Sequence, residues 1–296
     1  MSEPEFLLSV MHRHPDWCVL ICLVGGGQEI NTGEAGIQEW LSALECHYPH
    51  WATYSSSQLV ETGDLTEAVS RRLPSRRNWV ADDDLHLSVS VRSFRSEKLA
   101  GFVSAVLENK AETARGVLEE IPNYPMCLTR SIVSARAWLR RHTRGTERTG
   151  LVASSNGLRL KPHGIHVKSS IEPPLWFLKG KADVRSSFQL EDVATEFDVQ
   201  GLELDWVGIC WDANLRRASA DWKEFRFRGT AWQNIKDPAD QKYTRNSYQV
   251  LLTRARQGFV IFVPPGDDND PTSPRGLYDP IFEFLRECGI PCIDSD

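Results

Sequence analysis

The chain has 296 residues, of which 41% are apolar and 25% are charged, and its formal net charge is -6. This composition is typical of a soluble globular protein with one large domain or two modest ones, and it excludes a protein that coats nucleic acid by bulk positive charge. No apolar run reaches the roughly 18 to 20 residues of a membrane span, and the acidic start does not resemble a signal peptide. We therefore expect a cytoplasmic protein with no membrane partner.

The seven cysteines lie mostly inside apolar runs. Neither the pair Cys18 and Cys22 nor the pair Cys288 and Cys292 has the close spacing and histidine partners of a zinc site. We expect reduced, structural cysteines and no bound metal, with a metal or a disulfide as the alternative. The ten tryptophans are explained by anchoring of core and loops, and base stacking is the alternative.

The first part of the chain predicts a helix over residues 5–14, a buried strand over 17–24 and a second helix over 32–44. Between the strand and the second helix lies Gly25-Gly26-Gly27-Gln28. A strand, glycines and a helix in this order are typical of a backbone that approaches phosphate, although a plain tight turn explains the glycines equally well.

An alternating pattern over residues 85–91 predicts a half-covered strand, and the apolar spacing over 99–107 predicts a helix that packs on it. Arg92 and Arg95 lie between the two elements. Open α/β sheets bind ligands at the carboxyl ends of their strands, so either arginine is a candidate ligand contact. The alternative is a loop arginine paired with a neighbouring acid.

Residues 126–141 predict a helix with one apolar face. The basic residues on its other side and in the following loop are Arg130, Arg136, Arg140, Arg141, Arg144 and Arg148. Such a surface is either an ordinary solvated face or a track for the phosphate backbone of a nucleic acid. A short buried strand over 151–153 follows, and residues 171–187 are expected to form a long loop.

Two stretches in the last third change character within a few residues. Residues 195–205 form a polar loop that runs directly into an apolar strand over 206–210. In the second stretch, a helix is expected to stop at Gly258, just before a buried strand over 259–263. Arg254 and Arg256 lie where the predicted helix gives way to the strand. A planar guanidinium there can bind a phosphate or can simply be solvated at a helix end. Residues 212–240, between the two stretches, are predicted to form an insertion hairpin.

These two stretches resemble motifs V and VI of superfamily 1 (UvrD/Rep-like) helicases, and they are most similar to the Schlafen group 3-like DNA/RNA helicase domain family. The residues at matching spacing are Thr195, Gly201, Leu202, Glu203, Tyr248, Leu252, Thr253, Arg254, Ala255 and Arg256. Phe197 and Gln200 depart from the family pattern. Residues 25–28 resemble motif III, and residues 94–96 resemble motif IV.

The resemblance implies an α/β fold with a RecA-like parallel sheet flanked by helices. Residues 1–60 would be the end of a first RecA-like domain, residues 61–80 a linker, and residues 81–296 a second RecA-like domain. It also implies an ATP-dependent helicase or translocase that acts on DNA or RNA, in single-stranded form.

The resemblance further implies roles for individual residues. Arg254 would be the arginine finger, Arg95 a second phosphate contact and Gln28 a phosphate sensor. The expected nucleotide-binding residues are Gly201, Glu203, Arg92 and Arg256. Arg136, Arg140 and Arg144 of the basic surface, with Thr195 of the motif V-like loop, are the candidate nucleic-acid contacts.

The sequence contains neither G-x-x-x-x-G-K-[ST] nor an apolar strand that ends in an Asp-Glu pair. ATP with Mg²⁺ would therefore be shared with a missing N-terminal RecA-like domain or subunit, and we expect no ATP turnover by the chain alone. The alternatives are a truncated or degenerate helicase-like module that binds nucleic acid or protein without catalysis, and an unrelated α/β enzyme with similar strand-end arginines.

Overall fold

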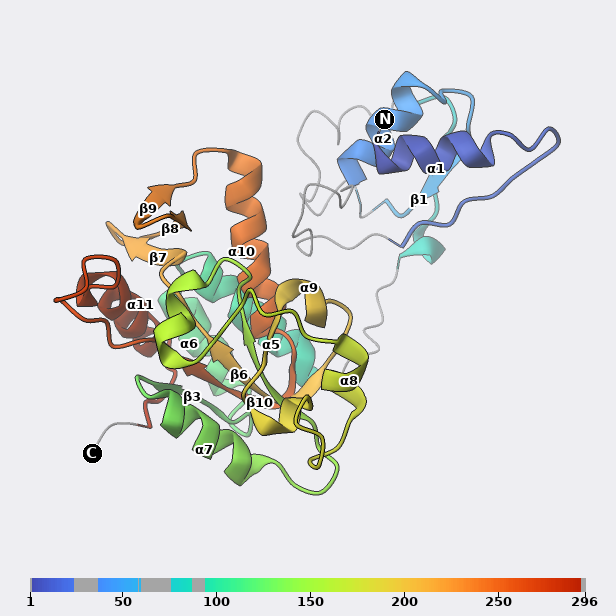
Figure 1. Cartoon of the computed structure of the whole chain (residues 1–296). Coiled ribbons are helices and arrows are strands. Elements are labelled where there is room, and N and C mark those ends of the chain that lie inside the picture. Colours follow the sequence, from blue (N-terminus) through green and yellow to red (C-terminus); the bar gives the residue numbers. More distant parts are fainter. Residues whose placement is uncertain (1, 24–36, 58, 60–75, 87–93, 294–296) are drawn as a thin grey trace. The chain divides into compact units, whose positions relative to one another are not determined.

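The computed structural model divides into two compact units, Met1–Val91 and Arg92–Asp296 (Figure 1). The residues that the structure describes are 2–23, 37–57, 59, 76–86 and 94–293, and for residues 38 and 94–97 only the backbone is described. Most of the predicted linker lies outside these ranges. The predicted domain limits therefore stay predictions.

The first unit contains helix α1 (Glu3–Met11), which begins at a capping box between Ser2 and Glu5, and helix α2 (Ile37–Cys46). Both helices were expected from the sequence and are confirmed. Leu8 of α1 packs against Ala43 and Leu44 of α2 in a small apolar cluster.

Two short strands of the first unit, β1 (Thr53–Ser55) and β2 (Trp79–Ala81), pair in parallel. They are followed by a 3₁₀ helix, η2 (Asp83–Leu85), whose cap is Asp82. Leu85 therefore does not begin a strand, because the Asp82 carboxylate accepts from the Asp84 amide and closes a helical turn there. The rest of the predicted strand, residues 87–91, lies outside the described residues.

Residues 17–23 correct the prediction of a buried strand. They have no regular secondary structure, and Trp17, Val19, Ile21 and Leu23 are 79%, 65%, 82% and 84% exposed. An apolar run forms a buried strand only where neighbouring strands and an apolar layer cover it. Within the described residues no strand pairs with this segment.

The second unit is built on a five-stranded sheet in the order β3-β10-β6-β4-β5, with all neighbours parallel. Its strands are β3 (Met126–Thr129), β4 (Thr149–Ala153), β5 (Val193–Thr195), β6 (Leu204–Cys210) and β10 (Ala255–Phe262). Helices flank this sheet, so the predicted RecA-like α/β fold is confirmed (Figure 1).

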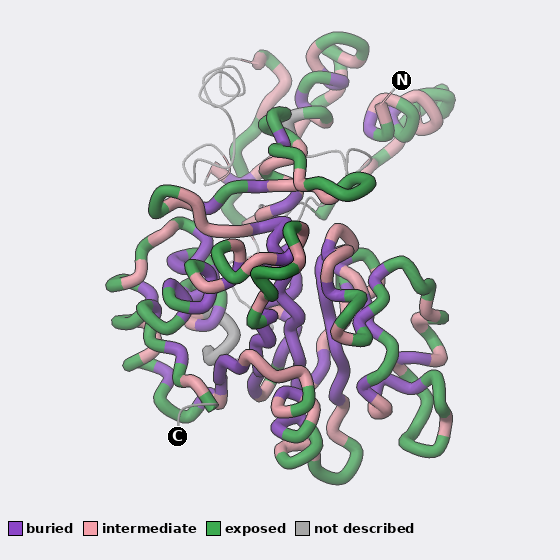
Figure 2. The backbone as a smooth tube through the Cα atoms, turned by 60° about the vertical axis from the view of Figure 1, so that its left-hand side comes forward, coloured by how far each residue is buried: buried purple, intermediate pink, exposed green. Residues whose placement is uncertain are grey.

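Continuous apolar runs form the central strands because both faces of the sheet are covered. Leu151, Val207, Ile209 and Val260 are all 0% exposed, and Figure 2 shows the buried strands running through the interior of the unit. The helices of the unit are α5 (Phe94–Leu107), α6 (Ala111–Glu119), α7 (Ile132–His142), α8 (Pro173–Leu178), α9 (Glu196–Val199), α10 (Pro238–Leu252) and α11 (Arg275–Glu287). Short 3₁₀ helices η3 (Leu158–His163) and η4 (Ser187–Gln189) lie in the connections.

The helix expected over residues 126–141 is wrong in its first part. Residues 126–129 form strand β3, and α7 begins only after Ser131, whose side chain caps it by accepting from the Ser134 amide. Leu128 has the four-residue spacing of the α7 core residues, but it pairs with Ile261 of β10. The spacing alone could not separate a buried strand from the helix that follows it.

Two further predictions in the second unit are corrected. The long loop expected over residues 171–187 contains α8, which starts with two prolines at its first positions. Gly258 does not end a helix: α10 ends at Leu252, and Gly258 lies inside β10. A Cβ atom there would be 2.3 Å from the Pro125 carbonyl oxygen, so the close approach of this backbone requires glycine.

After β6 the chain forms an antiparallel meander of three strands, β7 (Leu215–Ala218), β8 (Asp221–Arg228) and β9 (Ala231–Asn234). This confirms the expected hairpin and adds a third strand to it. No helix in the described part of the chain combines the length and the apolar character that crossing a lipid bilayer requires.

Candidate functional site

Three loops meet at the edge where the parallel strands of the five-stranded sheet begin. They are residues 143–148 before β4, residues 200–203 before β6, and residues 253–254 before β10. The Leu204 amide donates to the Arg254 carbonyl oxygen (2.9 Å), which ties the second loop to the third. This amino-terminal edge therefore joins the two stretches that carry the helicase-like motifs.

Arg254 is 1% exposed and is fastened to the backbone around it. Its Nε donates to the Val250 carbonyl (3.0 Å), Nη1 to the carbonyls of Leu202 (3.3 Å) and Val199 (3.4 Å), and Nη2 to the Thr253 hydroxyl (3.1 Å). In this arrangement the guanidinium group links the loop before β6 to the end of α10. It faces protein oxygen atoms, not solvent.

Arg256 and Glu203 lie beside this buried arginine and are more accessible. Their side chains are 65% and 34% exposed, and Arg256 Nε is 3.9 Å from the Glu203 carboxylate. Gly201 has a φ of +80°, a left-handed conformation that favours glycine, with open space where a side chain would be. The predicted nucleotide-binding residues Gly201, Glu203 and Arg256 are thus brought together at one edge.

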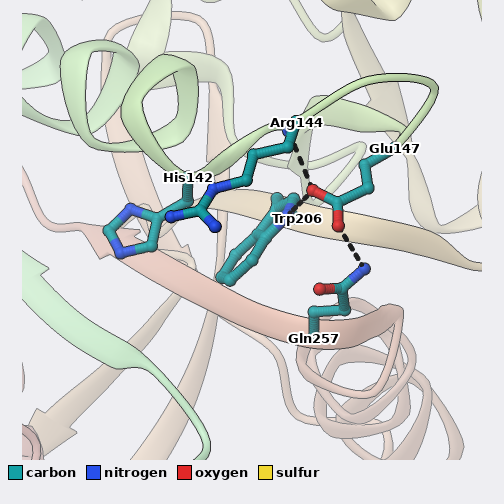
Figure 3. Close-up of a pocket in the computed structure, with 5 residues that line it drawn as sticks. All are labelled: His142, Arg144, Glu147, Trp206 and Gln257. Atoms are coloured by element: carbon teal, nitrogen blue, oxygen red, sulfur yellow. Dashed lines mark hydrogen bonds between the residues drawn. The ribbon is translucent and has the colours of Figure 1, made fainter.

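A pocket of about 250 Å³ opens at the same edge, lined by His142, Arg144, Glu147, Trp206 and Gln257 (Figure 3). The Glu147 carboxylate accepts hydrogen bonds from the Trp206 indole (2.9 Å), the Arg144 amide (2.8 Å) and the Gln257 side chain (3.0 Å). These bonds, the one from Trp206 most strongly, hold the pKa of Glu147 below its usual value. The pocket therefore has a fixed carboxylate.

The wall of the pocket is aromatic. The His142 ring lies 4.9 Å from the Trp206 ring and 3.9 Å from the Trp138 ring, measured between centroids. His142 Nδ1 is 2.9 Å from the Trp138 carbonyl oxygen, which can only accept, so this nitrogen carries the proton. In Figure 3 the Arg144 side chain extends toward His142. An aromatic surface beside a cation suits a nucleobase and its phosphate.

The predicted basic surface of α7 separates into two parts. Arg136 is only 18% exposed, lies 3.6 Å from the Glu191 carboxylate and donates to the Leu190 carbonyl (2.9 Å). Arg140 and Arg144 are exposed, and the Arg144 guanidinium makes no ion pair within the described residues. Arg144 lines the pocket, and the Arg140 guanidinium donates to the Gln189 carbonyl (3.4 Å). Of the three arginines, Arg144 is therefore the one most available to a ligand.

Thr195 lies at the opposite edge of the sheet, where β5 ends. Its amide and hydroxyl both donate to the Asp198 carboxylate, each at 2.7 Å, and so begin α9. The adjacent Glu196 is 1% exposed and accepts from Ser155 and Ser247, and burial raises its pKa. The structure does not bring Thr195 together with Arg144.

The remaining predicted residues stay untested. Gln28 and Arg92 lie outside the described residues. Arg95 lies in the first turn of α5, and nothing further is described of its side chain.

The described residues do not by themselves fit a nucleotide with Mg²⁺. Among them, no group of three or more His, Cys, Asp or Glu side chains could hold a metal ion. Phosphate recognition needs donors that are free to meet the phosphate, whereas Arg254 is held by protein carbonyls and Arg256 stands beside a carboxylate. The edge therefore offers a partial site.

Four pocket residues were missed in the sequence: His142, Glu147, Trp206 and Gln257. Trp206 lies near the start of β6, inside a run that reads as a core strand, and Gln257 lies near the start of β10, where the sequence predicted the end of a helix. A polar or aromatic side chain at the start of a parallel strand shares an edge with the loops before neighbouring strands. This signal was present in the sequence.

Comparison with known families agrees with the motif spacing. The family model described as Schlafen group 3, DNA/RNA helicase domain matches residues 1–265. No curated protein and no solved structure gives a significant match. The matched range includes all three loops of the amino-terminal edge and the complete five-stranded sheet. The chain therefore belongs to the Schlafen group 3 DNA/RNA helicase domain family.

Proposed function

We propose that this chain is the second RecA-like portion of a superfamily 1 (UvrD/Rep-like) helicase or translocase that acts on single-stranded DNA or RNA. The observation that carries the proposal is the joining of residues 199–204 to residues 248–256 at one edge of the sheet. The Arg254 side chain donates hydrogen bonds to the carbonyls of Val199 and Leu202, and the Arg254 carbonyl accepts one from the Leu204 amide. Two loops that are hydrogen-bonded to each other can move together, as is expected of a domain whose contacts change when a ligand binds and when it is released.

The nucleotide, ATP with Mg²⁺, would be shared with another RecA-like domain or subunit that supplies a phosphate loop and a metal carboxylate. On this chain, Arg256 is exposed and Glu203 is partly exposed at the edge. In the arrangement described, Arg254 positions the loop before β6. Its role as an arginine finger stays a proposal, because phosphate contact would require its bonds to Val199 and Leu202 to open. The roles of Arg95, Arg92 and Gln28 also stay proposals.

The nucleic-acid track would run along the exposed arginines at the end of α7, Arg140 and Arg144, and past the aromatic pocket. Arg136 would hold the neighbouring loop, and Thr195 would be a separate contact at the opposite edge. The second candidate function is a helicase-like binding module without catalysis. It is favoured by the exposed arginines together with the incomplete nucleotide site.

Binding of a labelled single-stranded oligonucleotide at several salt concentrations tests the proposal. We expect log K to fall with log salt, and each phosphate contact that is removed should lower that slope by about 0.7. The variants are Arg140→Glu and Arg144→Glu, and Arg286→Glu on α11 is the control, because it is also an exposed helix arginine. Unchanged affinity in both the Arg140→Glu and the Arg144→Glu variant would contradict this track. Affinity that is the same with and without added ATP would favour the binding module.

A further inference from the structure

The meander of β7, β8 and β9 presents a row of cationic and aromatic side chains on one face. Arg216 pairs with Lys223 across the first two strands, and Phe227 pairs with Trp232 across the last two. Paired residues share a face of an antiparallel sheet, and alternate residues along one strand do too. Lys223, Phe225 and Phe227 alternate along β8. All five side chains therefore lie on the same face.

The opposite face of the meander is turned into the protein. Trp222 and Glu224 alternate with the residues of the first face and are 0% and 1% exposed. Trp222 donates to the Val106 carbonyl (2.8 Å), and Glu224 pairs with Arg245 of α10. The inward face thus anchors the meander. On the first face Arg216, Phe225, Phe227 and Trp232 are half-buried, and the Trp232 indole donates to the Thr272 carbonyl (2.8 Å). We call this half-buried face the outer one.

The side chains of the outer face form a continuous row in which each contacts the next. The Arg216 guanidinium lies 3.5 Å from the Phe225 ring centre and 5.4 Å from that of Trp232. The rings of Trp232 and Phe227 are 5.2 Å apart, and the Arg159 guanidinium, from η3, lies 5.5 Å from Phe227. We call these five residues, Arg159, Arg216, Phe225, Phe227 and Trp232, the arginine–aromatic ladder.

Two donors of the ladder are buried without a hydrogen-bond partner, Arg216 Nη1 and Arg159 Nε. A buried donor without an acceptor is costly and is rare in folded proteins, so each can take an acceptor from outside the chain, either a water molecule or a ligand. Arg159 also pairs with Asp270, which neutralises its charge. Arg216 has no ion pair among the described residues, and burial lowers its pKa to about 10, which leaves it charged at neutral pH.

We propose that the ladder is a second binding site for single-stranded nucleic acid, with bases stacked on Phe225, Phe227 and Trp232 and a backbone phosphate on Arg216. Lys223 is exposed on the same face and lies 3.4 Å from the Asp221 carboxylate, and it adds a second cation for the backbone. Aromatic side chains beside arginine are the common platform for unpaired bases, whereas a duplex hides its base faces. The meander follows the carboxyl end of β6, so this site is separate from the α7 arginines at the amino-terminal edge.

The test uses the full chain with fluorescein-labelled oligo-dT and oligo-U, read by anisotropy at low salt. Arg216→Gln and Trp232→Ala should each weaken binding by about tenfold, in keeping with the loss of one stacking or phosphate contact. Two controls should stay within about twofold. Trp232→Phe keeps a ring, and Arg228→Gln removes an exposed charge from the same strand on the opposite face. Circular dichroism checks that each variant is folded.

If Arg216→Gln and Trp232→Ala bind as tightly as the unaltered chain while Arg144→Glu binds weakly, the ladder inference fails and the proposed function stands. Equal affinity for duplex and single strand would also overturn the inference. No binding of any oligonucleotide would overturn both. If Trp232→Ala does not fold, photo-crosslinking of iodouridine-substituted oligo-U to the unaltered chain decides, because the account requires crosslinks within residues 215–234.

Discussion

The two units of the chain differ in whether their apolar runs are buried. In the second unit, Leu151 and Ile209 lie on strands of the sheet and are 0% exposed. In the first unit, Trp17 and Ile21 belong to an equally apolar run but are 79% and 82% exposed. An apolar run therefore becomes a buried strand only where the same unit supplies neighbouring strands and an apolar layer.

The first unit buries only small clusters in its described part, such as Leu8 with Ala43 and Leu44. The second unit has a large cluster on one face of the sheet, which includes Leu139, Leu151 and Val260. This difference is what we would expect if residues 1–60 belong to the end of a first RecA-like domain whose sheet covers residues 17–23. The following predictions test that comparison.

The largest effect is expected from separating the units. A fragment of residues 92–296 should unfold cooperatively on heating, with a free energy of unfolding in the ordinary range of about 5–15 kcal/mol. A fragment of residues 1–91 should show no cooperative transition. Differential scanning calorimetry of the two fragments is the measurement, and a sharp transition in residues 1–91 would break the comparison.

A matched pair of substitutions tests whether the two apolar runs differ in burial in solution. Ile209→Ala removes a fully buried side chain from β6 and should lower the free energy of unfolding by about 2–5 kcal/mol. Ile21→Ala removes the same atoms from an exposed position and should change it by less than about 0.5 kcal/mol. Urea denaturation curves measure both, and similar losses for the two variants would show that residues 17–23 are covered in solution.

A second pair compares a buried with an exposed arginine within the second unit. Arg254→Ala removes the side-chain donor to the Leu202 carbonyl and one of the two donors to the Val199 carbonyl, which keeps the Leu202 amide, and we expect a loss of about 2–3 kcal/mol. Arg256→Ala should cost less than about 0.5 kcal/mol, because its side chain is 65% exposed and its ion pair is long. Equal urea midpoints for both variants would argue against Arg254 as the joint between the two loops.

The smallest effect is a dependence on pH. Burial raises the pKa of Glu196, so the folded chain keeps this proton at pH values where the unfolded chain has lost it. Its contribution to stability is fully present below the unfolded pKa of about 4.3 and is lost as pH rises through the raised folded pKa. Glu196→Gln should flatten this part of the curve of melting temperature against pH.

Asp183 is the control for that curve, because its pKa moves the other way. Hydrogen bonds from Arg185 lower it to about 2, so its contribution is present above the unfolded pKa and is lost as pH falls. Asp183→Asn should therefore leave the slope of melting temperature against pH unchanged at pH values above about 4.3. A slope that is the same in the Glu196→Gln variant and in the unaltered chain would contradict the raised pKa.

Much of the fold was predictable, because continuous apolar runs such as residues 206–210 and 259–263 are strands wherever a sheet covers both faces. The failures have local causes. Leu128 matched the helical spacing of α7 although it lies on a strand, and Gly258 looked like a helix stop although close backbone packing requires it. Spacing shows which residues share a face, but it does not show where one element ends.

The site was predictable at the level of motifs and not at the level of atoms. The spacing placed Gly201, Glu203 and Arg254 at a shared site, and the structure brings them to one edge. It could not show that the Arg254 side chain turns inward, because this depends on carbonyls of residues 199–202 that lie far away in the sequence. The pocket around Trp206 was missed although its signal, a polar or aromatic side chain at the start of a parallel strand, was present in the sequence.

The most direct test of the proposed function is ATP turnover by the purified chain, with and without single-stranded DNA, beside Arg254→Ala and Arg256→Ala. We predict no turnover above the blank in any of these samples, because the phosphate loop and the metal carboxylate would come from another domain. Steady turnover that rises with DNA and is lost in either arginine variant would contradict the account, since the chain would then contain a complete nucleotide site.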